Sequence, residues 1–266
     1  MSKLPTVLIT GASSGIGATY AERFARRGHN LVIVARDRER LEALATRLQG
    51  EYGIAVDVVQ ADLTNVNELA TVEKRLKEDT QIGVLINNAG IGQSGTFTEQ
   101  TVDSIDSLLS INITAVTKLA AAIAPRLVQA GEGAIVNIGS VVGFAPEFKM
   151  SVYGASKAYV LFLSQGLHLE LNPRGVYVQA VLPAATRTEI WQRSGVDIDA
   201  LPEVMEVGDL VDAAMVGYDR RELVTIPPLQ AAECWNALDE ARRLVMANIH
   251  QERPAERYKV APKANT

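Results

Sequence analysis

The chain has 266 residues, a length that fits one large domain or two small ones and can bury a sizeable core. Apolar residues make up 47% and charged residues 21%, which excludes a disordered chain, and the net charge of −5 gives no sign of a nucleic-acid-binding surface. The single cysteine, Cys234, excludes an internal disulfide and a cysteine-rich zinc site, so we expect a reducing, cytoplasmic location. No uninterrupted apolar run reaches the roughly 18 residues of a membrane span, and the N-terminus lacks a signal-peptide layout.

Short apolar runs alternate along the chain with longer helical patterns. The runs predict strands at 6–10, 31–35, 56–61, 84–87, 134–139, 176–183 and 223–227. The patterns between them predict helices over about 15–28, 37–49, 65–78, 98–124 and 151–171. Continuous β-branched runs separated by helices indicate buried parallel strands with crossover helices on both faces. The predicted fold is therefore α/β, a doubly wound parallel sheet of about seven strands with helices on both faces.

A glycine-rich segment, TGASSGIG at 10–17, joins the first strand to the first helix. Ligands of a doubly wound sheet bind beyond the carboxyl ends of its strands, where this segment lies. Gly11, Gly15 and Gly17 allow a tight turn and close backbone approach to a pyrophosphate, and the following helix offers free N–H groups to phosphate. A tight turn without any ligand is the alternative interpretation. The position at the start of a strand–helix–strand unit favours dinucleotide binding.

The end of the second strand bears on the choice between two nicotinamide cofactors. NAD-preferring sites place a carboxylate there to accept hydrogen bonds from the ribose hydroxyls, whereas this strand is followed by Arg36. A guanidinium pairs with a 2′-phosphate, so Arg36 favours NADP(H), with Arg38 as a possible second ligand. The neighbouring Asp37 weakens this preference, and Arg36 could instead begin a solvated helix, so NAD(H) remains the alternative.

Tyr153 and Lys157 are four positions apart at the start of the predicted helix 151–171 and therefore share one helical face. A phenol with a pKa of ~10 is protonated at neutral pH, and a nearby ammonium would lower that pKa and ease proton transfer. The spacing alone also fits an ordinary helix surface. Ser140 after the fifth strand, Asn112 and the NNAG segment at 87–90 occur in the right order, which makes coincidence improbable.

Together these motifs resemble the short-chain dehydrogenase/reductase family over about residues 5–190. The resemblance implies a single-domain Rossmann fold and hydride transfer between a nicotinamide and a carbonyl carbon, without a metal ion. It implies that Tyr153 is the general acid or base, that Ser140 places the substrate oxygen, and that Lys157 binds the nicotinamide ribose. Asn112 would anchor a water that links the lysine to solvent.

The same resemblance implies a set of cofactor contacts spread along the chain. Besides Tyr153 and Lys157, they are Gly11, Ser13, Ser14, Ile16, Gly17, Arg36, Asp62, Leu63, Asn88, Ala89, Gly90, Pro183, Thr186 and Thr188. After the sixth strand the family usually has Pro-Gly, whereas this chain has Pro183-Ala184, which the turn accepts only if the alanine has ordinary dihedrals. Family members commonly form homodimers or homotetramers, so we expect a homo-oligomer.

We expect one domain over 1–266, in which the segment at about 187–222 covers the substrate and a helical extension follows at about 229–266. Apolar residues of the covering segment and of the loop after Ser140 suit a small hydrophobic ketone, aldehyde or secondary alcohol. Arg187 and Arg193 leave an acidic substrate open. The extension has one apolar stripe, which we expect to pack on the chain's own core rather than on a partner: Trp235, Leu238, Leu244 and Val245.

The predicted function is an NADP(H)-dependent oxidoreductase that acts on a small carbonyl or alcohol substrate, with no nucleic-acid or membrane partner. An NAD(H)-dependent alcohol dehydrogenase and a 3-oxoacyl-thioester reductase are the alternatives within the family, although the C-terminal extension argues against a fatty-acid-synthesis enzyme. A sensor that binds NADP(H) without turnover belongs to another class, as does a nucleotide-sugar epimerase or dehydratase. The presence of both Tyr153 and Lys157 disfavours the sensor, and the glycine spacing disfavours the epimerase or dehydratase.

Overall fold

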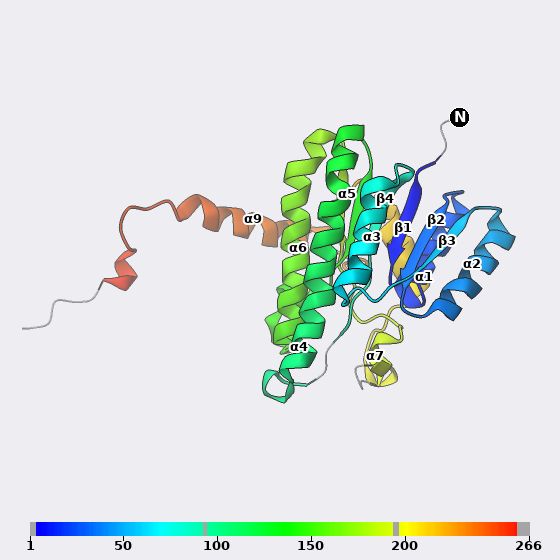
Figure 1. Ribbon diagram of the computed structural model, residues 1–266. Coiled ribbons are helices and arrows are strands. Elements are labelled where there is room, and N and C mark those ends of the chain that lie inside the picture. Colours follow the sequence, from blue (N-terminus) through cyan, green and yellow to red (C-terminus); the bar gives the residue numbers. More distant parts are fainter. Residues whose placement is uncertain (1–3, 93–94, 194–196, 260–266) are drawn as a thin grey trace, which may run out of the picture. The chain divides into compact units, whose positions relative to one another are not determined.

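The computed structural model describes residues 4–92, 95–193 and 197–259. Within this part of the chain, seven parallel strands form one sheet in the order β3-β2-β1-β4-β5-β6-β7 (Figure 1). The strands are β1 (Thr6–Thr10), β2 (Leu31–Ala35), β3 (Val56–Gln60), β4 (Ile82–Asn87), β5 (Ala134–Ile138), β6 (Tyr177–Val181) and β7 (Val224–Thr225). The predicted doubly wound sheet is therefore confirmed, and its order reverses between β1 and β4.

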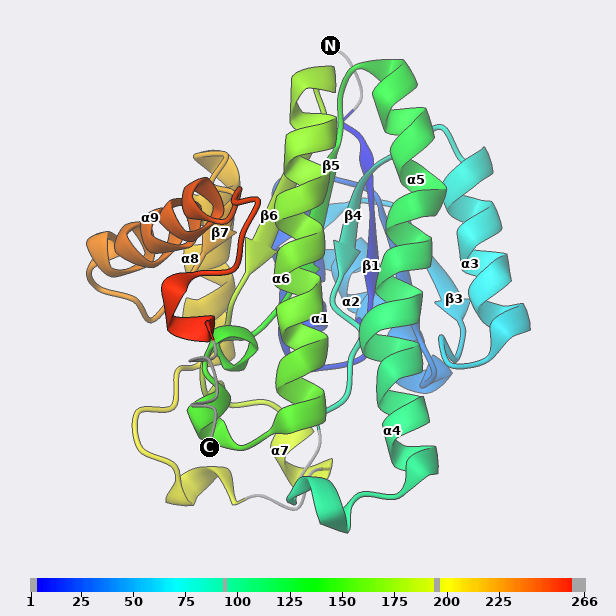
Figure 2. The ribbon, with the colours of Figure 1, turned by 90° about the vertical axis from the view of Figure 1, so that its left-hand side faces the viewer.

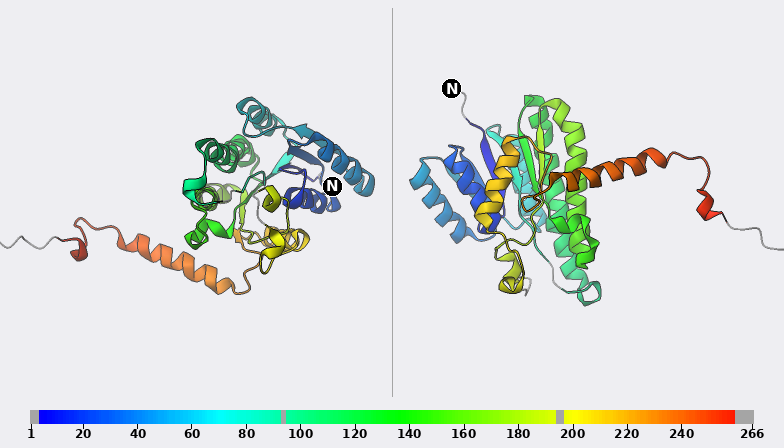
Figure 3. Two further views of the ribbon diagram at one scale, coloured as in Figure 1. Left: turned by 90° about the horizontal axis from the view of Figure 1, so that it is seen from below. Right: turned by 180° about the vertical axis from the view of Figure 1, so that it is seen from behind.

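Helices cover both faces of the sheet, as Figures 2 and 3 show. The helices of the part that contains the sheet are α1 (Gly15–Arg26), α2 (Arg38–Tyr52), α3 (Val66–Glu78), α4 (Val102–Leu109), α5 (Val116–Ala130), α6 (Ser151–Leu171), α7 (Ile190–Arg193) and α8 (Val207–Asp219), and α9 (Ala232–Asn248) belongs to a separate C-terminal unit. Alternate strand residues serve the two faces: Val7 and Ile9 pack with α1, α2 and α8, whereas Leu8 packs with α3 and α5. Because both faces are covered, β1 is apolar throughout apart from its end residues and is buried along its whole length.

The helix predicted at 98–124 is a longer, composite element. A 3₁₀ turn at Phe97–Glu99 precedes α4, a π-helical turn at Ser110–Ala115 joins α4 to α5, and α5 continues to Ala130, where Gly131 (φ 71°) ends it. The stretch Val102–Ala130 is long and apolar enough to cross a membrane by length and composition, with a mean hydropathy of 1.5 over its best window. Of that window, 56% is buried in the structure, as in a core helix of a sheet protein.

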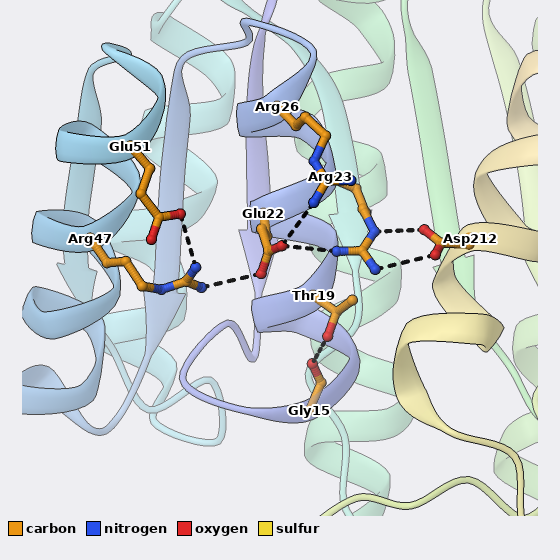
Figure 4. Close-up of polar contacts among 8 residues, drawn as sticks. All are labelled: Gly15, Thr19, Glu22, Arg23, Arg26, Arg47, Glu51 and Asp212. Carbon is orange, nitrogen blue, oxygen red and sulfur yellow. Dashed lines mark hydrogen bonds and ion pairs between the residues drawn. The ribbon is translucent and has the colours of Figure 1, made fainter.

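Charged side chains fix α1 between two neighbouring helices (Figure 4). The Nε of Arg23 lies 2.6 Å from Asp212 of α8, and Arg23 also pairs with Glu22 at 3.0 Å. Arg47 of α2 reaches the other oxygen of Glu22 at 3.3 Å. Exposed ion pairs of this kind contribute roughly 0.2–1 kcal/mol each, so their main effect is to hold α1, and with it the loop before it, in register with α2 and α8.

The chain divides into two compact units, Met1–Pro228 and Leu229–Thr266. The first contains the sheet and α1 to α8. The second contains α9, within which no residue is buried. The expectation that the apolar stripe of this helix packs on the chain's own core concerns a contact between the two units and stays a prediction.

Candidate active site

The glycine-rich loop closes tightly against the end of β4. Gly11 has a φ of 66°, and a Cβ on Gly17 would lie 2.3 Å from the Gly11 carbonyl oxygen, so neither position accepts a side chain. The Asn88 amide donates from Nδ2 to the carbonyl oxygens of Thr10 (2.9 Å) and Gly11 (3.1 Å). The Thr10 hydroxyl in turn accepts from the backbone N–H groups of Asn88 and Ala89, each at 3.0 Å. Hydrogen bonds between the ends of β1 and β4 thus fix the shape of the glycine-rich loop.

The N-terminus of α1 lacks the side chains that usually neutralise a helix start. Ser14 occupies the N-cap without a side-chain capping bond, and the first turn carries no acidic residue. The backbone N–H groups and the positive end of the helix dipole are therefore available to a phosphate. Ile16 packs its side chain on the core, and Ser13 is half-buried, so contacts from these two predicted residues would be made mainly by the backbone and the Ser13 hydroxyl.

Arg36 and Asp62 lie together beyond β2 and β3, their nearest atoms 3.9 Å apart, with the Arg36 side chain 60% exposed. Burial raises the pKa of the Asp62 carboxyl, but hydrogen bonds from Thr64 and the Arg36 charge outweigh it and hold that pKa below its ordinary value. Leu63 is a buried core side chain. Arg38 pairs with Glu42 of its own helix at 2.7 Å. Arg36 therefore remains the guanidinium best placed to meet a phosphate at this edge.

Asn112 lies in the π-helical turn and binds the irregular segment that follows Gly90. Its Oδ1 accepts from the N–H of Ile91 and its Nδ2 donates to the carbonyl of the same residue, both at 3.0 Å. The same Nδ2 donates to the Ser156 hydroxyl at 3.1 Å. A Cβ on Gly90 would lie 3.0 Å from the Asn112 Oδ1 and 3.7 Å from the Lys157 Nζ. The Asn112 side chain thus joins the segment after β4 to α6, and a side chain at position 90 would crowd the Asn112 Oδ1 while making only ordinary contact with Lys157.

Ser140, Tyr153 and Lys157 meet at the carboxyl end of β5. Ser140 lies two residues beyond the end of the strand, is buried, and makes a side-chain hydrogen bond with Tyr153. The Lys157 Nζ donates to the Ile138 carbonyl at 3.0 Å and lies 5.7 Å from the centroid of the Tyr153 ring. Gly143 permits this arrangement, since a Cβ there would lie 2.7 Å from the Lys157 backbone.

The pKa of Tyr153 differs from the expectation. Burial lowers the pKa of Lys157 to about 8. Burial also raises the pKa of Tyr153 to about 12, and the Ser140 hydrogen bond only partly opposes this. The predicted lowering of the tyrosine pKa by Lys157 is therefore wrong for the structure as it stands, because burial of the phenol dominates.

The segment after β6 starts with Pro183, whose carbonyl accepts from the Val141 N–H at 3.0 Å and so couples the strand end to the loop after Ser140. Ala184 is not among the described non-glycine residues with a positive φ, so alanine fits this turn without strain. Thr186 is buried and pairs with Met205 as an isolated parallel bridge. Thr188 lies against the glycine-rich loop, where a Cβ on Gly15 would be 3.3 Å from its Cγ2.

The predicted covering segment 187–222 has two different parts. Its first part contains α7, and its second part is α8, whose Leu210 and Met215 belong to the core beside α1. Arg187 pairs with Asp199 at 2.7 Å and with Glu206 at 2.9 Å. It is therefore neutralised within the segment rather than offered to an acidic substrate. The Arg193 side chain lies outside the described residues.

Several positions that matter to the site do not stand out in the sequence. Thr10 joins the loop to β4, and Ser156 accepts from Asn112 while donating to the Tyr153 carbonyl at 2.7 Å. A threonine at a strand end and a serine inside a helix are ordinary in any sequence. The available signal is their position inside two motifs, TGASSGIG at 10–17 and YGASK at 153–157.

The fold and this site define a dinucleotide-binding α/β protein in which a Ser–Tyr–Lys group lies beside the phosphate-binding loop. The model of the short chain dehydrogenase family matches residues 5–198. The chain belongs to the short-chain dehydrogenase/reductase family and is an oxidoreductase of that family.

Two solved structures and one curated relative show how far the similarity extends. A short-chain dehydrogenase from Sphingobium yanoikuyae, solved in complex with NADPH, is 70% identical, with a TM-score of 0.95, over 96% of this chain and 100% of that one. A bulky-bulky ketone specific alcohol dehydrogenase from Comamonas testosteroni is 64% identical, with a TM-score of 0.91, over 97% and 99%. A very-long-chain 3-oxoacyl-CoA reductase from Anas platyrhynchos is 34% identical over 69% of this chain, which spans 60% of the length of that relative.

Proposed function

We propose that the protein is an NADP(H)-dependent alcohol dehydrogenase or carbonyl reductase. The observation that carries the proposal is the meeting of Ser140, Tyr153 and Lys157 at the end of β5, beside a glycine-rich loop that leaves the α1 N-terminus free for a phosphate. The Sphingobium relative in complex with NADPH supports the choice of cofactor. An NAD(H)-dependent enzyme and a 3-oxoacyl-thioester reductase remain the alternatives within the family, and the curated reductase relative favours the latter.

The residues of this chain suit such a cofactor. Gly11, Gly17 and the α1 N-terminus would hold its pyrophosphate, Arg36 its 2′-phosphate, and Lys157 its nicotinamide ribose. When bound, the cofactor would supply or accept the hydride.

In carbonyl reduction, Ser140 would donate a hydrogen bond to the substrate oxygen and Tyr153 would give it a proton. The raised pKa keeps Tyr153 protonated below about pH 12, which suits a general acid. Lys157 is charged below about pH 8, so its ammonium supports the phenolate that forms when the proton leaves. In alcohol oxidation the same groups act in reverse.

The Tyr153→Phe variant tests the reaction. Loss of the phenolic hydroxyl removes the proton donor but keeps the aromatic ring and so the shape of the site. Turnover of a ketone should therefore fall by roughly 10²–10⁴-fold. Binding of NADPH, followed by its fluorescence, should remain within about twofold of the wild type. A variant that keeps near-wild-type turnover would contradict the proposed role of the tyrosine.

The Arg36→Leu variant tests the cofactor preference. Because Arg36 would pair with the 2′-phosphate, which NADH lacks, the Kd for NADPH should rise roughly 10-fold or more while that for NADH changes little. Arg38→Leu is the matched control, since Arg38 is paired with Glu42. Equal effects of Arg36→Leu on both cofactors would contradict the preference.

The substrate class we favour is a hydrophobic ketone or secondary alcohol with two sizeable substituents. Phe144 and Phe148, which lie in the turns that follow Ser140, are 40% and 58% exposed and offer apolar surface to a substrate. The ketone-specific relative from Comamonas supports this class. A panel of diaryl ketones, small ketones, aldehydes and 3-oxoacyl thioesters, followed by NADPH absorbance, distinguishes it from the reductase alternative. We also propose that the protein is a homo-oligomer in the cytoplasm. The mass of the protein in solution tests the oligomeric state.

A further inference from the structure

One ion pair joins two parts of the Met1–Pro228 unit that are far apart in the sequence. The Arg40 Nη1 of α2 lies 2.7 Å and 2.8 Å from the two carboxylate oxygens of Glu189, the residue before α7. The two residues are 149 positions apart. Arg40 is itself oriented by Asp37, whose carboxylate lies 3.4 Å from its Nε. The pair therefore has a defined geometry although both side chains are partly exposed, at 48% and 38%.

The segment that carries Glu189 touches the phosphate-binding loop. Thr188 lies against Gly15, at the first residue of α1. Arg40 belongs to the first turn of α2, which follows Arg36 at the adenosine end of the proposed cofactor site. The chain between Thr186 and Glu189 thus spans from the nicotinamide end of the site toward its adenosine end.

The two ends of this span are held by different interactions. At the Thr186 end, backbone hydrogen bonds join Arg187 N to Met205 O at 2.9 Å and Met205 N to Ala185 O at 3.0 Å. The same end is reinforced by the ion pairs of Arg187 with Asp199 and Glu206. The Glu189 end is joined to α2 through side chains, in a contact that water and salt can compete for. Within the segment the Trp191 Nε1 donates to the Thr186 carbonyl at 2.7 Å, so residues 186–189, here called the strap, keep their own shape. Breaking the Arg40–Glu189 pair would release the strap from α2 without breaking the sheet.

We propose that the Arg40–Glu189 ion pair is a clasp that holds the segment 186–189 over the bound dinucleotide and sets the rate at which the cofactor leaves. Arg40 and Glu189 are positioning residues here, since they act through the strap. The inference rests on the proposed function, because it needs a nicotinamide dinucleotide in the site. It differs from a direct phosphate contact by Arg40 in that the clasp acts equally on NADPH and NADH.

The experiment measures dissociation of NADPH and NADH by stopped-flow fluorescence in the wild type, Arg40→Gln, Glu189→Gln and the double variant. Each single change should speed release of both cofactors by about two- to fivefold, the range that exposed ion pairs support. The double variant should be no faster than either single one, because both remove the same contact. The charge-exchanged variant, R40E with E189R, should return toward the wild-type rate, and added salt should speed release only where the pair is intact. Arg47→Gln, on the same helix but paired with Glu22 and Glu51, is the matched control and should leave both rates unchanged.

Two results would overturn the clasp. Release rates that stay at the wild-type value in both single variants show that the pair does not hold the strap. Weaker binding of NADPH alone in Arg40→Gln, with no change in Glu189→Gln, shows that Arg40 is a phosphate ligand. Absence of NADPH and NADH binding to the wild type itself overturns the proposed function together with the clasp, so the two failures are distinguishable.

Discussion

Lys157 is a charged group held in the protein interior by one main-chain contact. It is 7% exposed and donates to the Ile138 carbonyl. Its pKa falls to about 8 because burial penalises the ammonium. The site therefore keeps a group that costs stability, which is common where a residue is retained for binding or chemistry.

This cost predicts a pH-dependent stability difference between the wild type and Lys157→Met. Each tenfold change in proton affinity is about 1.4 kcal/mol, so burial of the ammonium costs about 3 kcal/mol near pH 7, and the variant should be more stable by about 2 kcal/mol after loss of the hydrogen bond. The unfolded chain keeps this proton up to about pH 10.5, whereas the folded chain releases it near pH 8. The penalty is thus complete below pH 8 and fades as the pH rises to 10.5.

Urea unfolding without cofactor at several pH values measures this difference. Lys74→Met, on the exposed side of α3, is the control and should show no such trend. A wild-type-to-variant difference that stays constant from pH 7 to 10 would contradict the account.

For single residues, the sequence predicted which side chains form the site better than it predicted their pKa values. The four-residue spacing places Tyr153 and Lys157 on one face of α6, because helix geometry is local. The direction of the Tyr153 pKa depends on burial by the Ser140 loop and α6 together, which spacing does not contain. The Arg40–Glu189 pair joins residues 149 apart, and no local pattern marks it.

Among the elements, β4, β5 and α6 are joined by a buried polar ladder. The Asn87 Nδ2 donates to the Asn137 Oδ1 at 3.0 Å, and the Asn137 Nδ2 donates to the Ser164 hydroxyl at 2.9 Å. All three residues are at most 2% exposed. Because a buried polar group without a partner is costly, this ladder fixes α6, and so Tyr153 and Lys157, relative to the sheet.

Removing the side chain of Asn137, the middle residue of this ladder, should destabilise the fold. Asn137→Ala takes a partner from both Asn87 and Ser164 and leaves a small cavity, so the free energy of unfolding should fall by about 3 kcal/mol. The urea midpoint at constant m-value measures the loss. Asn67→Ala, at an exposed position of α3, should change it by less than about 0.5 kcal/mol. An equally small effect of Asn137→Ala would show that the ladder does not carry the packing of α6.

Periodicity predicted the elements well where one pattern covers a whole element. The strands β1 and β2 and the helix α6 have the predicted bounds. The π-helical turn at Ser110–Ala115 was missed, because it changes the hydrogen-bond register without interrupting the apolar pattern. The last strand is shorter than the predicted 223–227, since only Val224–Thr225 pair with β6.

For the whole molecule, the division at Pro228 separates the site from the last segment. Every predicted site residue precedes it, and the unit Met1–Pro228 contains the whole sheet and α1 to α8. A chain that ends at Pro228 should therefore unfold cooperatively, with a Tm within about 4 °C of the full chain, and should bind NADPH. Calorimetry and NADPH fluorescence measure these properties. Loss of cooperative unfolding would show that the segment after Pro228 stabilises the sheet, directly or through a partner chain.

The strand order has a consequence for synthesis of the protein. β1 pairs with β2 on one side and with β4 on the other, and β4 begins only at Ile82. Until that strand has been made, the growing chain holds an apolar strand, buried in the finished sheet, with one hydrogen-bonding edge open. Such an edge can pair with other chains, so the nascent protein is exposed to aggregation during the interval between translation of β1 and of β4.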